Sequence, residues 1–216
     1  MKAIVIGATG ATGKYLVQEL IHDHQFEEVT VFVRRTSFAP HPQLKEVVVD
    51  FNQLEKYKAS VSTDVAFSCL GTTLKDAGSK QAQWKVDYEY QYEFAKLCAA
   101  QNIKTFVLLS AVGASPTSSL FYSRMKGELE VAIQPFNFEK LLIFRPASLK
   151  RPQSNRLGEK VMTALVGGLN AVGLFKNYHV IHVNDLAKAL INGAKKYDKG
   201  THFIEVKTIL KLFHEI

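Results

Sequence analysis

Hydrophobic residues gather in short runs along the chain, separated by longer segments in which they recur every three or four positions. Short apolar runs rich in β-branched residues are typical of strands buried in a parallel sheet. We expect strands at 2–6, 29–33, 46–50, 64–70, 105–110, 138–145, 180–183 and 201–206. The helical spacing predicts helices behind the first strand, over 121–134, 157–169 and 209–213, and after an N-cap at Asn184. This alternation predicts an α/β fold built on a doubly wound parallel sheet.

The segment 84–94 carries two periods at once. Its aromatic and apolar residues alternate strictly with polar ones, as in a strand with one exposed face. They also satisfy helical spacing through Gln101, and two parallel strands require a crossover of a dozen or more residues. We therefore expect a long helix here. Its aromatic stripe, Tyr88 to Phe94, is assigned to packing, and a subunit contact in a homodimer is left open.

Three glycines, Gly7, Gly10 and Gly13, occupy the turn from the first predicted strand into the first predicted helix. Without Cβ atoms, the backbone can turn sharply and approach a pyrophosphate closely. The unpaired N–H groups and the positive dipole end of the helix attract the same anion. The pattern indicates a Rossmann-like dinucleotide-binding turn, and the alternative is a tight turn without a ligand.

A nucleoside-triphosphate P-loop is a further alternative, because Gly13 and Lys14 resemble the end of that motif. The P-loop requires a glycine five residues before Gly13 and a serine or threonine after Lys14. Ala8 and Tyr15 stand at these positions. The P-loop interpretation is therefore excluded.

The second predicted strand ends in Arg34 and Arg35. NAD sites place an acidic residue about 20 residues beyond the glycines, where it binds the ribose 2′-hydroxyl. Guanidinium groups at this point favour the 2′-phosphate of NADP(H) through charge-assisted hydrogen bonds. A solvated surface pair is the alternative. After the third strand, Asp50 and Phe51 reach the sheet edge where an adenine ring would lie.

Candidate chemistry lies on the helix predicted over 121–134. Tyr122 and Lys126 are four residues apart and therefore share a face. The ammonium would favour the phenolate form of Tyr122, which makes this residue a usable general acid or base. Ser110, at the end of the preceding strand, could bind the same substrate oxygen. Tyr92 and Lys96 repeat the spacing, but they lie before the serine-bearing strand.

Composition and charge narrow the classes of function. With 216 residues, 47% of them hydrophobic, the chain supports one α/β domain, residues 1–216. Its net charge of +7 is scattered, so no nucleic-acid partner is expected. No apolar run approaches the ~20 residues of a membrane span. Cys69 and Cys98 lie in apolar segments, which suits free thiols in a reducing compartment, and we expect a cytoplasmic protein that contacts no membrane.

Two histidine pairs have a spacing found at metal sites. They are His22 with His24 and His179 with His182. No cluster of cysteine or glutamate accompanies either pair, and such clusters are typical of metal centres. We expect no metal.

Several segments together resemble one family. They are GATGATG (7–13), Arg34, AFSCLGTT (66–73), LLSAVGA (108–114), YSRMKGELE (122–130) and FRPASL (144–149). In this order they resemble the atypical, extended-like short-chain dehydrogenases/reductases, and in particular the Tat-interacting-protein-like oxidoreductases. The resemblance covers roughly the first 150 residues and implies an active site of Ser110, Tyr122 and Lys126. Many relatives have a run of serines or threonines where this chain has Ser110 followed by Ala111 and Val112.

The turn, the strand ends and the resemblance together define an expected cofactor site. Its residues are Gly7, Thr9, Gly10, Ala11, Thr12, Gly13, Arg34, Arg35, Asp50, Phe51, Cys69, Leu70, Gly71, Thr72, Lys126, Arg145 and Pro146. The cofactor-binding core is expected over about 1–146. A small substrate lobe is expected over about 147–216, with a loop at 152–156 on the substrate side of the cleft.

These features favour an NADPH-dependent reductase of a small carbonyl compound, which is the small-molecule partner we expect. Some proteins of this kind bind NADP(H) but act as regulators or redox sensors through a protein partner, and that alternative stays open. A sugar-nucleotide epimerase would need a larger C-terminal lobe than the residues after Arg145 offer.

Overall fold

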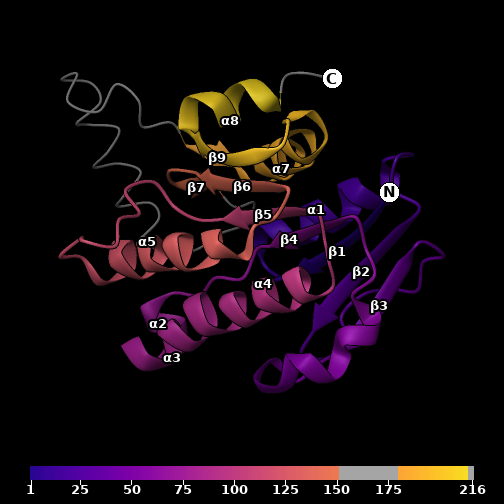
Figure 1. The fold of residues 1–216 in the computed structure, drawn as a ribbon, viewed down its shortest axis with the longest axis horizontal. Coiled ribbons are helices and arrows are strands. Elements are labelled where there is room, and N and C mark those ends of the chain that lie inside the picture. Colours follow the sequence, from indigo (N-terminus) through magenta and orange to yellow (C-terminus); the bar gives the residue numbers. More distant parts are fainter. Residues whose placement is uncertain (151–179, 214–216) are drawn as a thin grey trace.

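The structure is a computed structural model that describes residues 1–150 and 180–213. Its centre is a sheet of seven parallel strands in the order β3-β2-β1-β4-β5-β6-β9 (Figure 1). The strands are β1 (Lys2–Ile6), β2 (Glu28–Val33), β3 (Leu44–Val48), β4 (Val65–Ser68), β5 (Thr105–Leu109), β6 (Lys140–Arg145) and β9 (Gly200–Glu205). The predicted parallel sheet is confirmed.

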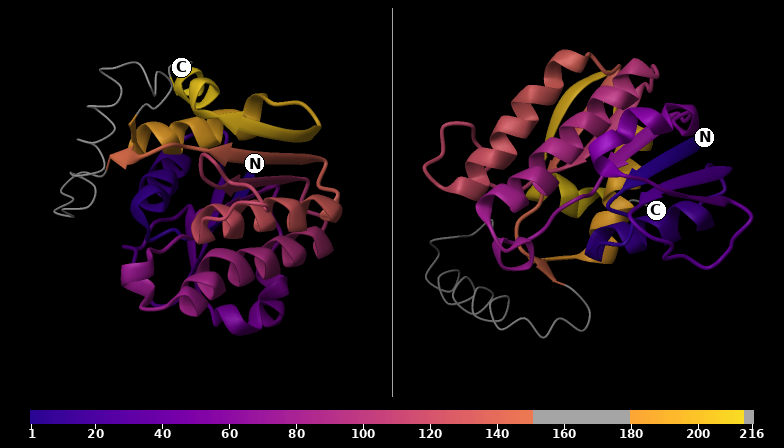
Figure 2. Two further views of the ribbon diagram at one scale, coloured as in Figure 1. Left: turned by 90° about the vertical axis from the view of Figure 1, so that its left-hand side faces the viewer. Right: turned by 90° about the horizontal axis from the view of Figure 1, so that it is seen from below.

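Helices cover both faces of this sheet (Figures 1 and 2). One face carries α1 (Ala11–His22), α7 (Val183–Lys196) and α8 (Val206–Leu212). The other carries η1 (Phe51–Ser60), α4 (Tyr90–Ala100) and α5 (Phe121–Ile133), which is followed by η3 (Gln134–Phe136). The doubly wound arrangement is therefore confirmed.

Two hydrophobic cores lie between the sheet and its helices. Strands β1, β4 and β5 are buried along most of their length, as their apolar runs predict. Leu16 and Leu20 of α1 pack with Leu190 of α7 in one core. Phe94 of α4 and Leu129 of α5 pack in the other. All five of these side chains are apolar and fully buried. Burial of this kind is why the apolar pattern of the strands and helices is clear in the sequence.

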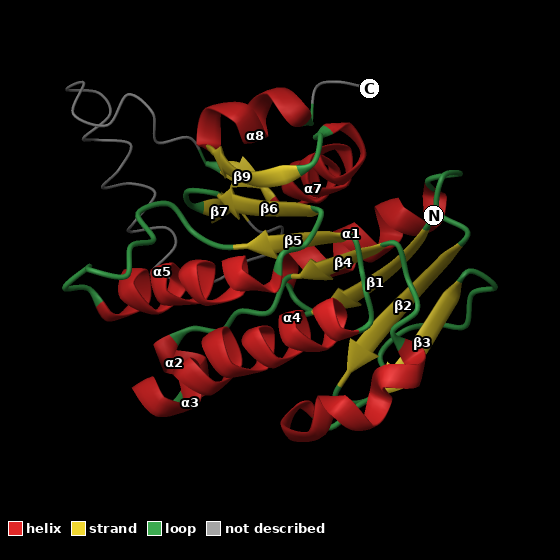
Figure 3. Cartoon of the chain, in the orientation of Figure 1, coloured by secondary structure: helices red, strands yellow, loops and turns green. Residues whose placement is uncertain are grey.

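The ambiguous segment 84–94 is helical, as predicted from the crossover it must make. The short helix α2 (Leu74–Ala77) is followed by α3 (Lys80–Trp84), which continues through a π-helical turn, η2 (Lys85–Glu89), into α4 (Figure 3). Tyr88 and Tyr92 stack with their ring centroids 6.1 Å apart and are half-buried. The alternating period therefore reflects an aromatic stack along a helix.

The C-terminal part of the chain contributes to the main sheet. Strand β9 pairs with β6 from Lys140 opposite Gly200 onwards, and α7 packs against α1. A separate two-stranded sheet is formed by β7 (Leu149–Lys150) and β8 (Ile181–His182). The loop at 152–156 and the helix at 157–169, both expected in a substrate lobe, lie outside the described residues.

Helix α7 begins two residues earlier than the N-cap prediction at Asn184. Its N-cap is His182, which has an extended backbone, and Val183 starts the helix with a fully buried side chain. Burial of Val183 thus overrides the capping preference of Asn184, which lies in the first turn beside Asp185.

The glycine turn packs backbone directly against backbone. Gly7 has φ +75°, and a Cβ there would lie 2.4 Å from the carbonyl carbon of Cys69. A Cβ on Gly13 would lie 2.1 Å from the carbonyl oxygen of Gly7. A Cβ on Gly10 would meet only that same oxygen, at 3.1 Å. Gly7 and Gly13 are therefore required by packing, whereas Gly10 has more room.

This difference predicts that Gly13→Ala destabilises the fold more than Gly10→Ala does. A Cβ on Gly13 forces β1 and α1 apart, and overpacking of this kind costs about 1–3 kcal/mol. The free energy of unfolding of both variants, measured by urea denaturation, checks the prediction. Equal stability of the two variants would contradict it.

Candidate functional site

The candidate site lies where the strand order of the sheet reverses. From β1 the sheet continues to β2 on one side and to β4 on the other. Ligands of open parallel sheets bind outside the carboxyl ends of the strands at such a point. Three cavities of about 570, 880 and 510 Å³ lie along this edge. The cavity of 510 Å³ shares Thr9 and Arg34 with that of 570 Å³ and Gly10 with that of 880 Å³, so it joins the other two into one cleft.

The glycine turn forms the centre of the cleft. Gly7, Thr9 and Gly10 line the cavity of 510 Å³, and Ala11 and Thr12 line that of 880 Å³. The first turn of α1 holds no acidic residue, so its free N–H groups can attract an anion. Of the expected turn residues, only Gly13 is away from these cavities, because it packs against Gly7.

One end of the cleft is strongly basic. The cavity of 570 Å³ is lined by Thr9, Lys14, Arg34, Arg35 and Ser37. Three of these five residues are cations, and none is a carboxylate. The cavity therefore suits a phosphate group close to the end of β2. In the sequence Lys14 stands out only for its P-loop-like position, 20 residues before the arginines, and only the fold places it beside them.

An apolar pocket adjoins the basic end. Phe32, Phe51, Val86 and Tyr90 are among the residues that line the cavity of 510 Å³, and the Phe51 and Tyr90 rings are 5.3 Å apart. Two aromatic faces of this kind suit a flat heteroaromatic ring.

Asp50 does not line any of these three cavities. Its carboxylate caps η1 and accepts hydrogen bonds from the Asn52 backbone N–H at 2.9 Å and from the Gln53 side chain at 2.7 Å. The bonds to Asn52 and Gln53 lower the pKa of Asp50 below its ordinary value. The expected contact of Asp50 with a cofactor therefore has no support from its position.

The other end of the cleft holds the expected active-site residues. Ser110, Tyr122 and Lys126 all line the cavity of 880 Å³, together with Cys69, Leu70, Gly71 and Thr72 from the end of β4. Tyr122 exposes 43% of its surface, whereas Lys126, one turn further along α5, exposes 2%. Tyr92 and Lys96 line none of the three cavities, and Lys96 pairs with Glu93 at 3.7 Å. Position thus separates the two pairs.

Cys69 is one of these lining residues, but its thiol is not activated. Burial raises the pKa of the Cys69 thiol to about 12, although the nearby charge of Lys126 opposes the shift. A thiol with this pKa is not a nucleophile at neutral pH. Cys69 and Cys98 are both free and buried, as expected.

A buried carboxylate, Asp87, faces Lys126. The Lys126 ammonium lies 3.5 Å from Asp87 Oδ1, and Asp87 exposes only 1% of its surface. The Thr72 N–H donates to Asp87 Oδ2 at 2.8 Å. Burial raises the pKa of Asp87, while Lys126 and the Thr72 N–H act in the opposite direction. Lys126 therefore has an anionic partner that the sequence analysis did not identify.

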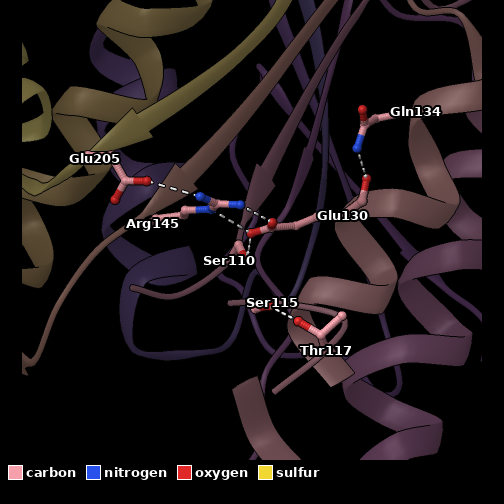
Figure 4. A network of polar contacts seen from close by, with 7 residues as sticks. All are labelled: Ser110, Ser115, Thr117, Glu130, Gln134, Arg145 and Glu205. Atoms are coloured by element: carbon pink, nitrogen blue, oxygen red, sulfur yellow. Dashed lines mark hydrogen bonds and ion pairs between the residues drawn. The ribbon is translucent and has the colours of Figure 1, made fainter. Parts of the chain in front are cut away.

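A second network fixes Ser110 (Figure 4). The Ser110 hydroxyl donates to Glu130 Oε1 at 2.5 Å, and Arg145 donates to both oxygens of Glu130, at 3.0 and 2.5 Å. Arg145 also donates to Glu205 at 3.1 Å. Because the Ser110 hydroxyl donates its hydrogen bond to Glu130, the serine oxygen can only accept a hydrogen bond from another group.

Arg145 and Pro146 were expected to contact the cofactor, but neither lines the three cavities. The guanidinium of Arg145 is held by Glu130 and Glu205, and the carbonyl of Pro146 accepts from the Val112 N–H at 2.9 Å. Both residues support the loop after β5. One feature of the sequence points to Glu130. It lies four residues after Lys126, so the two charged residues share a face of α5, and that face is buried.

No helix within the described ranges is both long and apolar enough to cross a membrane. Within the same ranges, no three side chains of the types that bind metals are grouped together. Of the histidines with metal-like spacing, His179 lies outside these ranges.

Comparison with known proteins gives consistent matches. A family model described as NAD(P)H-binding matches residues 7–136. The chain is 33% identical over 214 residues to the protein HTATIP2 of Rattus norvegicus, across 96% of this chain and 87% of that protein. It is 30% identical over 207 residues to the mitochondrial protein FMP52 of Candida albicans, across 93% of this chain and 90% of that protein.

Solved structures with the same fold include proteins that bind nucleotides. MoeE5 in complex with UDP-glucose and NAD matches with a TM-score of 0.73 and 16% identity, across 100% of this chain and 81% of that one. The UDP-glucose 4-epimerase of Thermotoga maritima with UDP-glucose matches with a TM-score of 0.70 and 16% identity, across 100% and 82%. At this identity the likeness concerns the fold.

The opposite pKa shifts of Asp87 and Asp50 predict the order in which they titrate. Asp87 should take up its proton above the ordinary value of 3.8, and Asp50 below it. Ionisation of Asp87 thus lowers stability as the pH rises through its folded pKa, whereas Asp50 loses its stabilising effect as the pH falls through its own. Carboxyl ¹³C NMR of the folded protein during acid titration measures both, and the reverse order would contradict the assignment.

Proposed function

Because this chain belongs to the NAD(P)H-binding family, as an atypical short-chain dehydrogenase/reductase with a Rossmann-like fold, we propose that it is an NADPH-dependent reductase of a small carbonyl compound. The observation that carries the proposal is the continuity of the cleft. One groove leads from the cationic cavity at Arg34, past the glycine turn, to Tyr122 and Lys126. One end therefore offers recognition of the cofactor, and the other offers acid–base chemistry for a substrate bound beside it.

The described residues of the cleft suit NADPH, and none of those that line its phosphate-binding end is a carboxylate. Arg34, Arg35 and Lys14 would bind the 2′-phosphate, and the adjoining Phe51 and Tyr90 rings would contact one side of the adenine. The N–H groups at the start of α1 would bind the pyrophosphate. Lys126, which lines the cavity of 880 Å³, would hold the nicotinamide ribose. When bound, the reduced nicotinamide supplies a hydride to the carbonyl carbon.

Tyr122 is the proposed proton donor for the substrate oxygen. It is the half-exposed phenol of this cavity, and Lys126 supports it from one helical turn away. Ser110 is proposed to position the substrate. While its proton is donated to Glu130, its oxygen can accept only from an N–H or O–H group of the substrate, and a bond to the carbonyl oxygen requires the hydroxyl to turn away from Glu130.

A reducing compartment suits the buried free thiols Cys69 and Cys98. The cytoplasm remains our proposal for the location. The names of fungal relatives place those proteins in mitochondria, and the mitochondrial matrix is also a reducing compartment. Imaging of the tagged chain in its own cells decides between the two.

The choice of NADPH over NADH is tested by Arg34→Ala. Loss of a charge-assisted hydrogen bond to the 2′-phosphate should weaken NADPH binding about ten- to a hundredfold and leave NADH binding nearly unchanged. Isothermal titration calorimetry of both cofactors measures this. Lys58→Ala is the matched control, because Lys58 is an exposed cation of η1 outside the three cavities. A wild-type protein that binds both cofactors equally would contradict the assignment.

The acid–base role is tested by Tyr122→Phe, which removes the proton donor without a change of shape. Turnover should fall by roughly 10²- to 10⁴-fold while NADPH binding is retained. Tyr92→Phe is the internal control and should have little effect. The assay is oxidation of NADPH with a panel of aldehydes, ketones and quinones. Tight NADPH binding without turnover on any of them would favour the regulatory, cofactor-sensing alternative.

A further inference from the structure

Three polar side chains interrupt the buried face of the helical segment from α3 to α4. Gln83, Asp87 and Gln91 follow one another at intervals of four residues and are each at least 96% buried. Asp87 lies at the middle of the π-helical turn η2. Turns of this kind inside α-helices are frequent at functional sites, because they redirect side chains.

The neighbours of Asp87 hold its backbone and the opposite loop in place. The Gln91 side chain donates to the Asp87 carbonyl oxygen at 2.6 Å and accepts from the Ser68 hydroxyl at 2.9 Å. The Gln83 side chain donates to the Thr72 carbonyl oxygen at 3.2 Å. The position of Asp87 relative to β4 and the loop after it is thus fixed by hydrogen bonds on both sides.

The carboxylate of Asp87 connects two parts of the cleft. Its Oδ2 accepts from the Thr72 N–H, and Thr72 lines both the 880 and the 510 Å³ cavities. Its Oδ1 is fully buried, has no hydrogen-bond partner in the described structure, and lies 3.5 Å from the Lys126 ammonium. Gly71 is a neighbour of this carboxylate, since a Cβ there would be at van der Waals distance, 3.6 Å, from Oδ1.

Asp87 is also the one carboxylate within ion-pair distance of Lys126 among the described residues. Removing one partner of a buried pair leaves the other charge uncompensated, which is strongly unfavourable. The buried Lys126 ammonium therefore relies on Asp87 for its counter-charge, and the Thr72 N–H relies on Asp87 for its hydrogen-bond acceptor.

We propose that Asp87 is a positioning residue of the site, which holds the Lys126 ammonium and the cofactor-lining loop at Thr72 with one carboxylate. The role assigned to Lys126 rests on the proposed function, whereas the link between Asp87, Lys126 and NADPH binding does not require turnover. Asp87 thereby couples the helix that carries Tyr122 to the loop along which the cofactor lies.

The test is a double-mutant cycle on NADPH affinity, measured by calorimetry. Asp87→Asn keeps an oxygen for the Thr72 N–H but removes the charge, and should weaken NADPH binding about tenfold. On the Lys126→Met background, Asp87→Asn should weaken NADPH binding less than about twofold, because the partner of Asp87 is already absent. Glu89→Gln, an identical change at an exposed residue of the same helical turn, is the control and should bind NADPH normally.

A spectroscopic measurement on the cofactor-free protein separates positioning from general stability. The ¹⁵N-detected ammonium signal of Lys126, assigned by its absence in Lys126→Met, should be visible in the wild type and in Glu89→Gln but lost in Asp87→Asn. The Thr72 amide resonance should move in Asp87→Asn. A persistent ammonium signal, or a full tenfold loss of affinity on the Lys126→Met background, would overturn the proposal.

Folding of the variants is read from their melting temperatures. If Asp87→Asn does not fold, the double variant with Lys126→Met should fold, because it leaves no unpaired buried charge. Failure of the double variant as well would assign Asp87 to the fold alone and overturn the proposal. If Asp87→Asn and Lys126→Met are coupled in NADPH affinity but the wild type turns over no carbonyl compound, the positioning role of Asp87 stands and the proposed reductase function does not.

Discussion

Close backbone contact at the glycine turn is the constraint on which the site depends. Gly7 meets the backbone of Cys69, and Gly13 meets the carbonyl of Gly7, at distances that no side chain would allow. The end of β1, the start of α1 and the end of β4 therefore converge. This convergence places the first turn of α1 and the loop at Thr72 on the same crevice. Every other part of the proposed site is positioned relative to it.

The two ends of the cleft handle positive charge differently. At the end of β2, Arg34 and Arg35 are exposed, so water solvates them until an anion arrives. At the other end, Lys126 is almost completely buried and its charge is balanced by Asp87. An exposed cation cluster can select a phosphate, whereas a buried ammonium without a counter-charge is strongly unfavourable. The difference fits recognition at one end and chemistry at the other.

Helix α5 carries the proposed proton donor and is anchored from two directions. Lys126 meets Asp87 of η2, and Glu130, one turn further, meets Arg145 of β6. Figures 1 and 2 show α5 beside α4 and over the sheet. A small residue, Gly127, lets the Ser115–Pro116 segment pass over the helix, since a Cβ there would be 2.2 Å from the Ser115 carbonyl carbon. Tyr122 therefore stands in the first turn of a helix whose following two turns are anchored.

The sequence by itself determined the parallel sheet, the glycine turn and the basic end of β2, because these depend on local patterns: apolar runs, missing Cβ atoms and adjacent charges. It also identified Ser110, Tyr122 and Lys126, which the fold brings to one cavity. Only the tertiary structure decided the partners of these residues. Asp87 and Lys126 are far apart in the chain. Asp87 lies in a π-helical turn, which no simple period in the sequence predicts, and in the fold its carboxylate faces Lys126. Asp50 and Arg145 had suitable positions in the sequence, but in the fold the Asp50 carboxylate accepts hydrogen bonds from Asn52 and Gln53, and the Arg145 guanidinium pairs with Glu130, because a polar group binds the nearest complementary group that folding supplies.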